Sequence, residues 1–372
     1  EEEGAAMILF VAQTFLPEAG VAPALMTGLV HALTLRGHPA EVYCRESRLA
    51  AVKAFDASRR YAVHRFGGPR FWRRMKLAGA VRRRIAQGGV TTVVTDSWKS
   101  LESLPAKALK GVRVVCLAHG NEYVGKAAPK ERLKSVLARA DVVVANSGFT
   151  AGLVRPLAGQ TPVDVVMPGI TPPHGAHPGM RTRPAGDRLL CMARLEPRKG
   201  IDQIIGALAA LKPRYPRLTL DIVGQGEDGP RLTELATALG VSGRVNFHGY
   251  VSETARGELF RQARVFVLPN RADNSGVDGF IPALLEAAAY GVPCVAGQAG
   301  GAPEQVLDEE TGLIVDGENI DSLTNALRHL LDDPILPRRL GDSAQKRFWA
   351  SFAWSEAASR YEVILGLTGD KI

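Results

Sequence analysis

The sequence predicts an α/β protein with two doubly wound domains, each built on a parallel sheet with helices on both faces. Its 372 residues are too many for one ordinary core and suit two domains of common size. Short apolar runs alternate with longer helical patterns, which is typical of successive βαβ units. A segment rich in Pro and Gly divides these runs into two series.

The first series of apolar runs predicts the strands of an N-terminal domain. The runs are rich in Val, Ile and Leu, which is typical of strands buried on both faces. They lie at 7–15, 40–44, 91–95, 113–119 and 141–146. A second series of the same kind predicts a C-terminal domain, with runs at 188–195, 218–223, 244–247, 263–268, 293–296 and 312–315.

The segment 168–179 lies between the two series and can sustain neither a helix nor a central strand, because it holds several Pro and Gly residues. We therefore expect an N-terminal domain over 1–172 and a C-terminal domain over 173–353. The helical pattern from Trp354 to Leu367 is expected to cross back to the first domain, so that 354–372 belong with it. Residues 1–6 are expected to form a tail.

Composition narrows the classes of function. Lys and Arg exceed Asp and Glu by 46 to 38, and the net charge of +8 favours anionic partners. No stretch approaches the roughly 18 apolar residues of a membrane span, and the start lacks a signal-peptide pattern, so we expect a cytoplasmic location.

The four Cys residues are far apart and predict buried, reduced thiols. Neither Cys nor His residues have metal-ligand spacing, so no protein-held metal and no cofactor are expected.

Residues that follow predicted strands are the first candidates for a site, since ligands bind beyond the carboxyl ends of parallel strands. Gly20 follows the first strand and would let a phosphate approach the next helix, although such a glycine is more often a simple turn residue. Arg194 and Lys199 follow the first strand of the second domain. Two cations in that place can neutralise a diphosphate leaving group.

Two carboxylates flank the start of a helix in the second domain. Asp278 is expected in a loop and Glu286 about two turns inside the helix that follows, so both can face one ligand. The alternative is a solvated loop acid and a helix-surface acid. The next strand leads into Gly300, Gly301 and Glu304, a glycine loop that enters a further helix.

The order of these motifs resembles glycosyltransferase family 4. The matching segments are 36–38, 119–122, 146–150, 194–200, 278–286 and 300–304. The His-Gly-x-Glu and Val-Asp-Gly-Phe motifs are similar to those of its phosphatidylinositol mannosyltransferase branch. The resemblance implies the glycosyltransferase B fold, in which two Rossmann-like domains face each other across a cleft. In that fold residues 1–172 would bind the acceptor and residues 173–353 the nucleotide sugar. It also implies metal-free, retaining transfer of a hexosyl group from GDP-mannose or a UDP-sugar to a lipid-linked, glycan or small-molecule acceptor.

The resemblance assigns roles to residues. Arg194 and Lys199 would bind the diphosphate, Asp278 the hydroxyls of the donor sugar, and Glu286 the ribose. The backbone of 247–251 would contact the base, and His119 would lie beside the reacting sugar, where the alternative is an interior histidine. The implied catalytic residues are His119, Arg194, Lys199 and Asp278. The implied donor-binding residues are Gly20, Arg194, Lys199, Tyr250, Val251, Asp278, Gly279, Phe280, Ile281, Ala283 and Glu286.

The sequence departs from the family pattern in ways that leave the sugar preference open. Asp278 stands where Glu is usual, Val21 replaces the second residue of a frequent Gly-Gly pair, and Pro282 lacks an N–H in a loop whose amides usually serve the ligand. Two other functions therefore stay open. One is a nucleotide-sugar epimerase of the same architecture, and the other is a degenerate relative that binds a nucleotide or a membrane.

The segment from Arg65 to Arg84 is strongly basic and contains no acid. On a helical wheel one side carries Phe71, Met75, Ala78, Val81 and Ile85, and the opposite side carries Arg73, Lys76, Arg83 and Arg84. This pattern is typical of a helix lying on an anionic bilayer, and it fits equally a basic helix whose apolar side lies in the core. No nucleic-acid partner is expected, because no recognition motif accompanies the charge.

Overall fold

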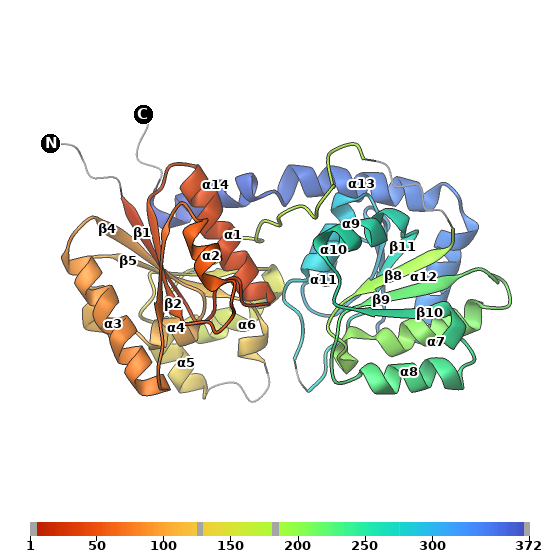
Figure 1. Ribbon diagram of the computed structural model, residues 1–372, viewed down its shortest axis with the longest axis horizontal. Coiled ribbons are helices and arrows are strands. Elements are labelled where there is room, and N and C mark those ends of the chain that lie inside the picture. Colours follow the sequence, from red (N-terminus) through yellow and green to blue (C-terminus); the bar gives the residue numbers. More distant parts are fainter. Residues whose placement is uncertain (1–5, 125–128, 181–185, 275, 368–372) are drawn as a thin grey trace. The chain divides into compact units, whose positions relative to one another are not determined.

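The computed structural model describes residues 6–124, 129–180, 186–274 and 276–367, and the chain divides into two compact units (Figure 1). Unit 1 comprises Glu1–Ile170 and Trp354–Ile372, and unit 2 comprises Thr171–Ala353. The division after Ile170 lies beside the boundary expected at position 172. Residues 1–5 of the expected tail lie outside the described residues.

Unit 1 is built on a parallel sheet with the strand order β3-β2-β1-β4-β5-β6-β7. Its strands are β1 (Met7–Ala12), β2 (Ala40–Arg45), β3 (Ala62–Phe66), β4 (Val90–Thr95), β5 (Arg113–Ala118), β6 (Val142–Ala145) and β7 (Val163–Val165). The edge strands β3 and β7 were not predicted. Both are partly exposed, so neither carries the continuous apolar run of a buried strand.

The helices of unit 1 cover both faces of this sheet, because buried apolar residues form one cluster on each face. They are α1 (Val21–Leu35), α2 (Val52–Ala57), α3 (Arg70–Ala86), α4 (Trp98–Glu102), α5 (Lys130–Leu137), α6 (Gly148–Ala158) and α14 (Trp354–Leu365), with 3₁₀ turns at Ala106–Leu109 and Asn121–Tyr123. As predicted, α14 belongs to unit 1, where it packs on α1. A Cβ at Gly28 or Gly169 would collide with Trp354.

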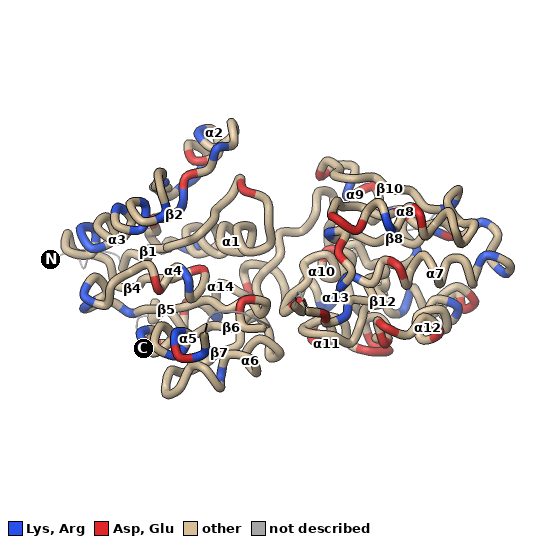
Figure 2. The backbone as a smooth tube through the Cα atoms, turned by 90° about the horizontal axis from the view of Figure 1, so that it is seen from below, with Lys and Arg blue, Asp and Glu red and all other residues tan. Residues whose placement is uncertain are grey.

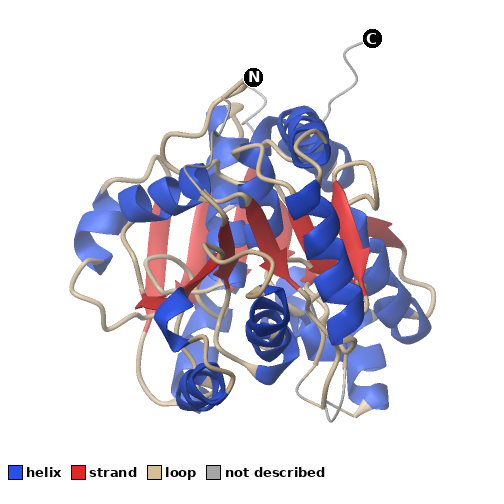
Figure 3. Cartoon of the chain, turned by 90° about the vertical axis from the view of Figure 1, so that its right-hand side faces the viewer, coloured by secondary structure: helices blue, strands red, loops and turns tan. Residues whose placement is uncertain are grey.

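Unit 2 is built on a second parallel sheet, with the strand order β10-β9-β8-β11-β12-β13. Its strands are β8 (Arg188–Met192), β9 (Thr219–Val223), β10 (Val245–Gly249), β11 (Val265–Leu268), β12 (Cys294–Gly297) and β13 (Gly312–Val315). Helices lie on both faces of the strands (Figure 3). They are α7 (Ile201–Leu211), α8 (Gly229–Ala238), α9 (Glu253–Gln262), α10 (Pro282–Ala289), α11 (Ala302–Gln305), α12 (Ile320–Asp332) and α13 (Leu336–Ser351), with 3₁₀ turns at Pro197–Lys199 and Ser242–Arg244.

The two parallel sheets confirm the predicted fold class, and both strand series fall where the apolar runs placed them. All four cysteines are free and buried, as predicted. Among the described residues, no helix is both long enough and apolar enough to cross a membrane.

Helix α3 divides its apolar residues between the core and the surface, which neither reading of the basic segment predicted. Leu77 and Val81 are buried in the core of unit 1, and Ile85 packs against it. At the other end of the helix, Phe71 is 66% exposed, Trp72 63% and Met75 58%. The expectation that Phe71, Met75 and Val81 share one lipid-facing side is therefore wrong, because Val81 is fully buried in the core while Phe71 and Met75 are exposed.

Candidate functional site

A buried cluster of charges follows strand β8 in unit 2. The chain leaves the strand through Arg194 to Gly200, and Gly200 adopts a left-handed conformation (φ 67°) against the Pro269 carbonyl, where a Cβ would collide. The 3₁₀ turn before it directs Lys199 Nζ to Asp278 Oδ2 (2.7 Å). Arg198 Nη1 donates to Asp278 Oδ1 (2.5 Å). Two predicted site residues, Lys199 and Asp278, are thus in direct contact.

The two cations, Lys199 and Arg198, keep the Asp278 carboxylate ionised. Burial alone would raise the pKa of Asp278, but the charges and hydrogen bonds of Lys199 and Arg198 outweigh it and lower the pKa below the ordinary value. The ionised carboxylate holds both cations in place in a buried setting. An incoming anion would meet two cations that are already desolvated and oriented.

Arg194 lies apart from this cluster. Its side chain is 67% exposed and pairs with Glu196 Oε1 (2.7 Å). The other oxygen of Glu196 accepts from Arg198 Nε (2.9 Å), so Glu196 connects the two arginines. Sequence reasoning chose Arg194 and missed Arg198, although Arg198 stands next to Lys199 and carries the same charge.

Glu286 is buried on α10, on the side that faces α9. Arg256 of α9 forms an ion pair with its carboxylate and also reaches Glu253 (3.6 Å). Burial raises the pKa of Glu286, and the charge of Arg256 opposes that shift. The predicted ribose ligand therefore has a cationic neighbour that the sequence did not reveal, since α9 and α10 are separated by β11.

The predicted donor loop 279–283 is shaped by backbone contacts. Ile281 donates its N–H to Gln305 Oε1 (2.7 Å) and accepts from Gln305 Nε2 (3.0 Å), so the Ile281 amide is already engaged. Pro282 is the first residue of α10, a position where its missing N–H costs the helix no hydrogen bond. Ala283 follows it in the first turn. Gly279 and Phe280 lie in the loop, with the Phe280 side chain buried.

The Gly-Gly motif packs against this loop. Gly301 donates its N–H to the Asp278 carbonyl (2.9 Å), and Gly300, with φ 68°, passes so close to it that a Cβ would collide. The motif therefore holds the backbone of Asp278 in place. Beyond β10, Tyr250 is 77% exposed and Val251 packs against the core of unit 2.

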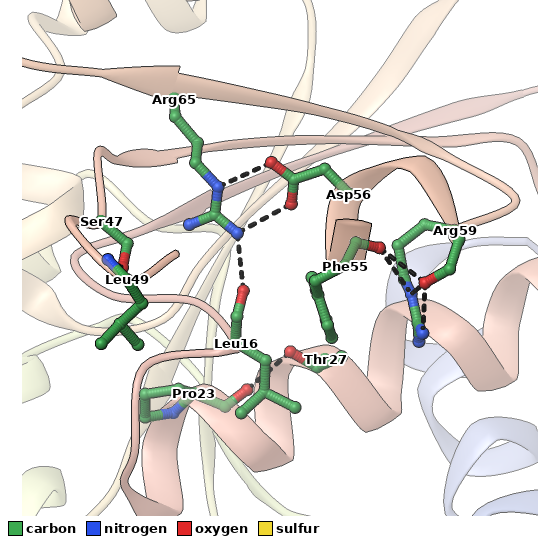
Figure 4. A network of polar contacts seen from close by, with 10 residues as sticks. Leu16, Pro23, Thr27, Ser47, Leu49, Phe55, Asp56, Arg59 and Arg65 are labelled. Carbon is green, nitrogen blue, oxygen red and sulfur yellow. Dashed lines mark hydrogen bonds and ion pairs between the residues drawn. The ribbon is translucent and has the colours of Figure 1, made fainter. Parts of the chain in front are cut away.

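The remaining predicted residues belong to unit 1. His119 follows β5, and its Nε2 lies 2.8 Å from the carbonyl oxygen of Asp96. Gly20 is the N-cap of α1, and Val21 is the half-exposed first residue of that helix. The turn before Gly20 is held by Arg65, whose Nη2 donates to the Leu16 carbonyl (2.6 Å) (Figure 4).

Arg65 does not belong to the membrane-facing basic surface expected from Arg65 to Arg84. Its side chain is buried, and its Nε and Nη2 each donate to Asp56 of α2 at 2.8 Å (Figure 4). Arg84 is similarly engaged with Glu41 (2.8 Å). Both arginines therefore support the fold. Among the described residues, five cations of the segment have no ion pair, namely Arg70, Arg73, Lys76, Arg82 and Arg83.

A basic pocket of about 560 Å³ lies at the carboxyl ends of the unit 1 strands, beside the first turns of α3. Its cationic lining comes from Arg45, Arg70, Arg73, Arg74, Lys99 and Arg132. Glu102 also lines it but is paired with Arg132 (2.5 Å) and Arg74 (3.4 Å). Figure 2 shows the Lys and Arg residues gathered along α3. An apolar groove of about 730 Å³, lined by Phe71, Met75, Leu104 and Pro105, shares Arg70 and Arg74 with the pocket.

Comparison with known proteins identifies the family. Residues 24–172 match Glycosyltransferase Family 4, and residues 182–347 match Glycosyl transferases group 1. A GDP-mannose-dependent alpha-(1-6)-phosphatidylinositol monomannoside mannosyltransferase of Mycolicibacterium smegmatis is 33% identical over 363 residues, which cover 93% of this chain and 94% of the relative. The chain belongs to glycosyltransferase family 4. The Mycobacterium tuberculosis enzyme of the same name is 32% identical to this family 4 protein, over 95% of this chain and 96% of its own.

Solved structures agree with the fold of a family 4 glycosyltransferase. HepE of Anabaena in complex with UDP has a TM-score of 0.79 at 20% identity, covering 97% of this chain and 99% of HepE. The chain is therefore a glycosyltransferase B enzyme, a hexosyltransferase that uses a nucleotide sugar, as its motifs predicted. Among the described residues, no group of three or more His, Cys, Asp or Glu side chains could hold a metal ion.

Proposed function

We propose that this glycosyltransferase moves a mannosyl group from GDP-mannose, with retention of configuration, to an anionic lipid-linked acceptor at the cytoplasmic face of a membrane. The basic pocket beside the apolar groove of unit 1 carries this proposal. Cations suit the phosphate of an acceptor headgroup, and the adjoining groove suits an acyl chain. The mycobacterial relatives support the same choice of donor and acceptor, since their names specify GDP-mannose and a phosphatidylinositol mannoside.

On the donor side, Lys199 and Arg198 neutralise the charge that develops on the diphosphate, with Arg194 closing on it from solvent. This arrangement needs no resident metal, because guanidinium and ammonium groups perform the electrostatic task. Asp278 orients the sugar hydroxyls and Glu286 the ribose. His119 lies beside the reacting sugar.

Transfer is tested by incubating the full chain with GDP-mannose or UDP-glucose and vesicles that contain phosphatidylinositol. We expect a mannolipid from GDP-mannose, detected by mass spectrometry, with an α-linkage by NMR. Conversion of the nucleotide sugar to an epimer without acceptor would favour the epimerase alternative. Nucleotide binding with neither reaction would favour a degenerate relative.

Membrane association is tested separately by sedimentation with anionic vesicles. We expect binding that salt reverses, because screening shortens the Debye length from about 10 Å to about 3 Å between 0.1 M and 1 M. Replacing the exposed Trp72 by Ser and the half-buried Arg73 by Gln should weaken binding about tenfold or more. Arg328→Gln removes an exposed charge from α12 and serves as the matched control. Equal binding to neutral vesicles would contradict the proposal.

A further inference from the structure

Asp96 joins the ends of three neighbouring strands of unit 1. It follows β4, which lies between β1 and β5 in the sheet. Its Oδ2 accepts the backbone N–H of Gln13, just beyond β1, at 2.8 Å. Its Oδ1 accepts from Ser100 Oγ (2.5 Å) and Ser97 Oγ (2.9 Å) at the start of α4. The buried carboxylate is thus satisfied by neutral donors and fixes the position of its own backbone.

That backbone in turn orients His119, which follows β5. The carbonyl oxygen of Asp96 lies 2.8 Å from His119 Nε2. Because a carbonyl oxygen only accepts, Nε2 must carry the hydrogen. The backbone of His119 is held as well, since its N–H donates to Glu122 Oε1 (3.2 Å) and its carbonyl accepts from Asn146 Nδ2 (3.2 Å).

The other ring nitrogen, Nδ1, is buried and has no hydrogen-bond partner within the part of the chain that the structure describes. In the tautomer set by Asp96, a neutral imidazole has a lone pair at Nδ1 and no hydrogen there. A buried acceptor without a partner is unfavourable, and a ligand hydroxyl would satisfy it. Sugars offer such hydroxyls.

We infer that Asp96 is a positioning residue that holds His119 in the Nε2–H tautomer, so that Nδ1 accepts a hydrogen bond from a substrate hydroxyl. This inference rests on the proposed function, in which His119 lies beside the transferring sugar. It assigns Asp96 a task that its distance in sequence from His119 does not suggest, and it excludes Nε2 as the atom that meets the substrate.

The tautomer can be measured without any substrate. In the full chain labelled with ¹⁵N-histidine, long-range ¹⁵N–¹H spectra distinguish a protonated Nε2 from a protonated Nδ1. His119→Gln identifies the signal among those of the eight histidines. We expect His119 to be protonated at Nε2 alone in the free protein. A proton on Nδ1, or a mixture of both tautomers, would overturn the inference.

Kinetics then test the positioning role. Asp96→Asn replaces one carboxylate oxygen by an NH₂ group, which would face hydrogen-bond donors. Ser100→Ala is the milder change, because it removes only one of those donors. Both should lower kcat, Asp96→Asn by about tenfold to a hundredfold, with donor KM within about twofold, because misplacing one group affects mainly the transition state. The tautomer ratio of His119 should shift in the same variants. Ser135→Ala, which loses only an exposed hydroxyl bonded to the Arg132 carbonyl of α5 (2.9 Å), is the matched control.

The outcomes separate this inference from the proposed function. Wild-type kcat and an unchanged tautomer in both Asp96→Asn and Ser100→Ala would refute the positioning role. An equal effect in Ser135→Ala would show that the loss of any helix hydroxyl in unit 1 slows transfer, and it would refute the positioning role too. If the wild-type chain transfers no sugar, the proposed function fails, and the tautomer spectra of the wild-type chain and of both variants decide the inference by themselves.

Discussion

Asp96 in unit 1 and Asp278 in unit 2 are both buried beyond the strands of a parallel sheet, but their partners differ in charge. Asp278 contacts two cations, Lys199 and Arg198. Asp96 accepts hydrogen bonds from a backbone N–H and two hydroxyls. The pKa of Asp278 is lowered, because the cations outweigh burial, whereas burial raises the pKa of Asp96 despite its hydrogen bonds.

The difference shows two ways of using a buried carboxylate. In unit 2 the carboxylate pairs with two buried cations and keeps them desolvated, which in the proposed function leaves them in position for the donor diphosphate. In unit 1 it fixes geometry, since its neutral donors come from β1 and α4 and tie these elements to the strand that precedes Asp96. Asp278 in unit 2 therefore acts through its charge, whereas Asp96 in unit 1 acts by orienting the backbone around it.

The largest expected effect comes from removing a buried cation. Lys199→Met should lower the free energy of unfolding by about 3 kcal/mol, because it leaves the Asp278 carboxylate buried with one cation fewer. Arg194→Ala removes an exposed pair and should cost less than about 1 kcal/mol. Both should slow transfer by about tenfold to a hundredfold. Urea unfolding and initial rates measure the two quantities, and equal stability losses would contradict the distinction.

A second prediction separates the two carboxylates of unit 2. Glu286→Ala should weaken nucleoside diphosphate binding by about tenfold to a hundredfold, since the ribose loses its acceptor. Asp278→Ala should leave the nucleotide affinity near wild type, because the loss of the acid that positions Lys199 and Arg198 is offset by the loss of its competition for them, while transfer slows by a similar factor. Calorimetry and initial rates provide the measurements. A loss of nucleotide affinity in Asp278→Ala equal to that in Glu286→Ala would show the division of roles to be wrong.

Asp278→Glu sharpens this prediction, because it restores the residue that is usual in the family while adding one methylene. The contacts of Asp278 with Lys199, Arg198 and Gly301 leave its loop closely packed. We expect the variant to be less active toward the native donor. Activity above wild type would show that the pocket has kept room for the longer acid.

The smallest effect is a difference in pH dependence. The folded pKa of Asp278 lies below 3.8, so its contribution to stability is present above that value and lost as the pH falls through the lowered pKa. The folded pKa of Asp96 lies above 3.8, so its contribution is lost as the pH rises through the raised pKa. Asp278→Asn should therefore lower the free energy of unfolding more at neutral than at acidic pH, relative to wild type. Asp96→Asn should lower it less at neutral than at acidic pH. Each slope is at most about 1.4 kcal/mol per pH unit, and urea unfolding across the acidic range measures it.

Helix α3 shows where sequence reasoning reached its limit in unit 1. The helical wheel gave the period correctly, but it could not tell which turns rest on the sheet. Val81 lies in the core, whereas Phe71 is exposed. Arg65 is likewise part of a basic run in sequence and part of a buried ion pair in the structure.

The sequence by itself determined the two parallel-sheet domains, the places of His119 and Lys199 after strands, and those of Asp278 and Glu286 around the start of a helix. It could do so because buried strands and helices carry characteristic apolar patterns, and the residues that flank them are adjacent in the sequence. Only the tertiary structure decided the polar partners. Arg198 and Asp278 are 80 residues apart, and the Asp96 carbonyl meets His119 because β4 and β5 are neighbours. Period and spacing describe one element at a time, whereas a hydrogen-bond partner depends on which strand ends the fold brings together.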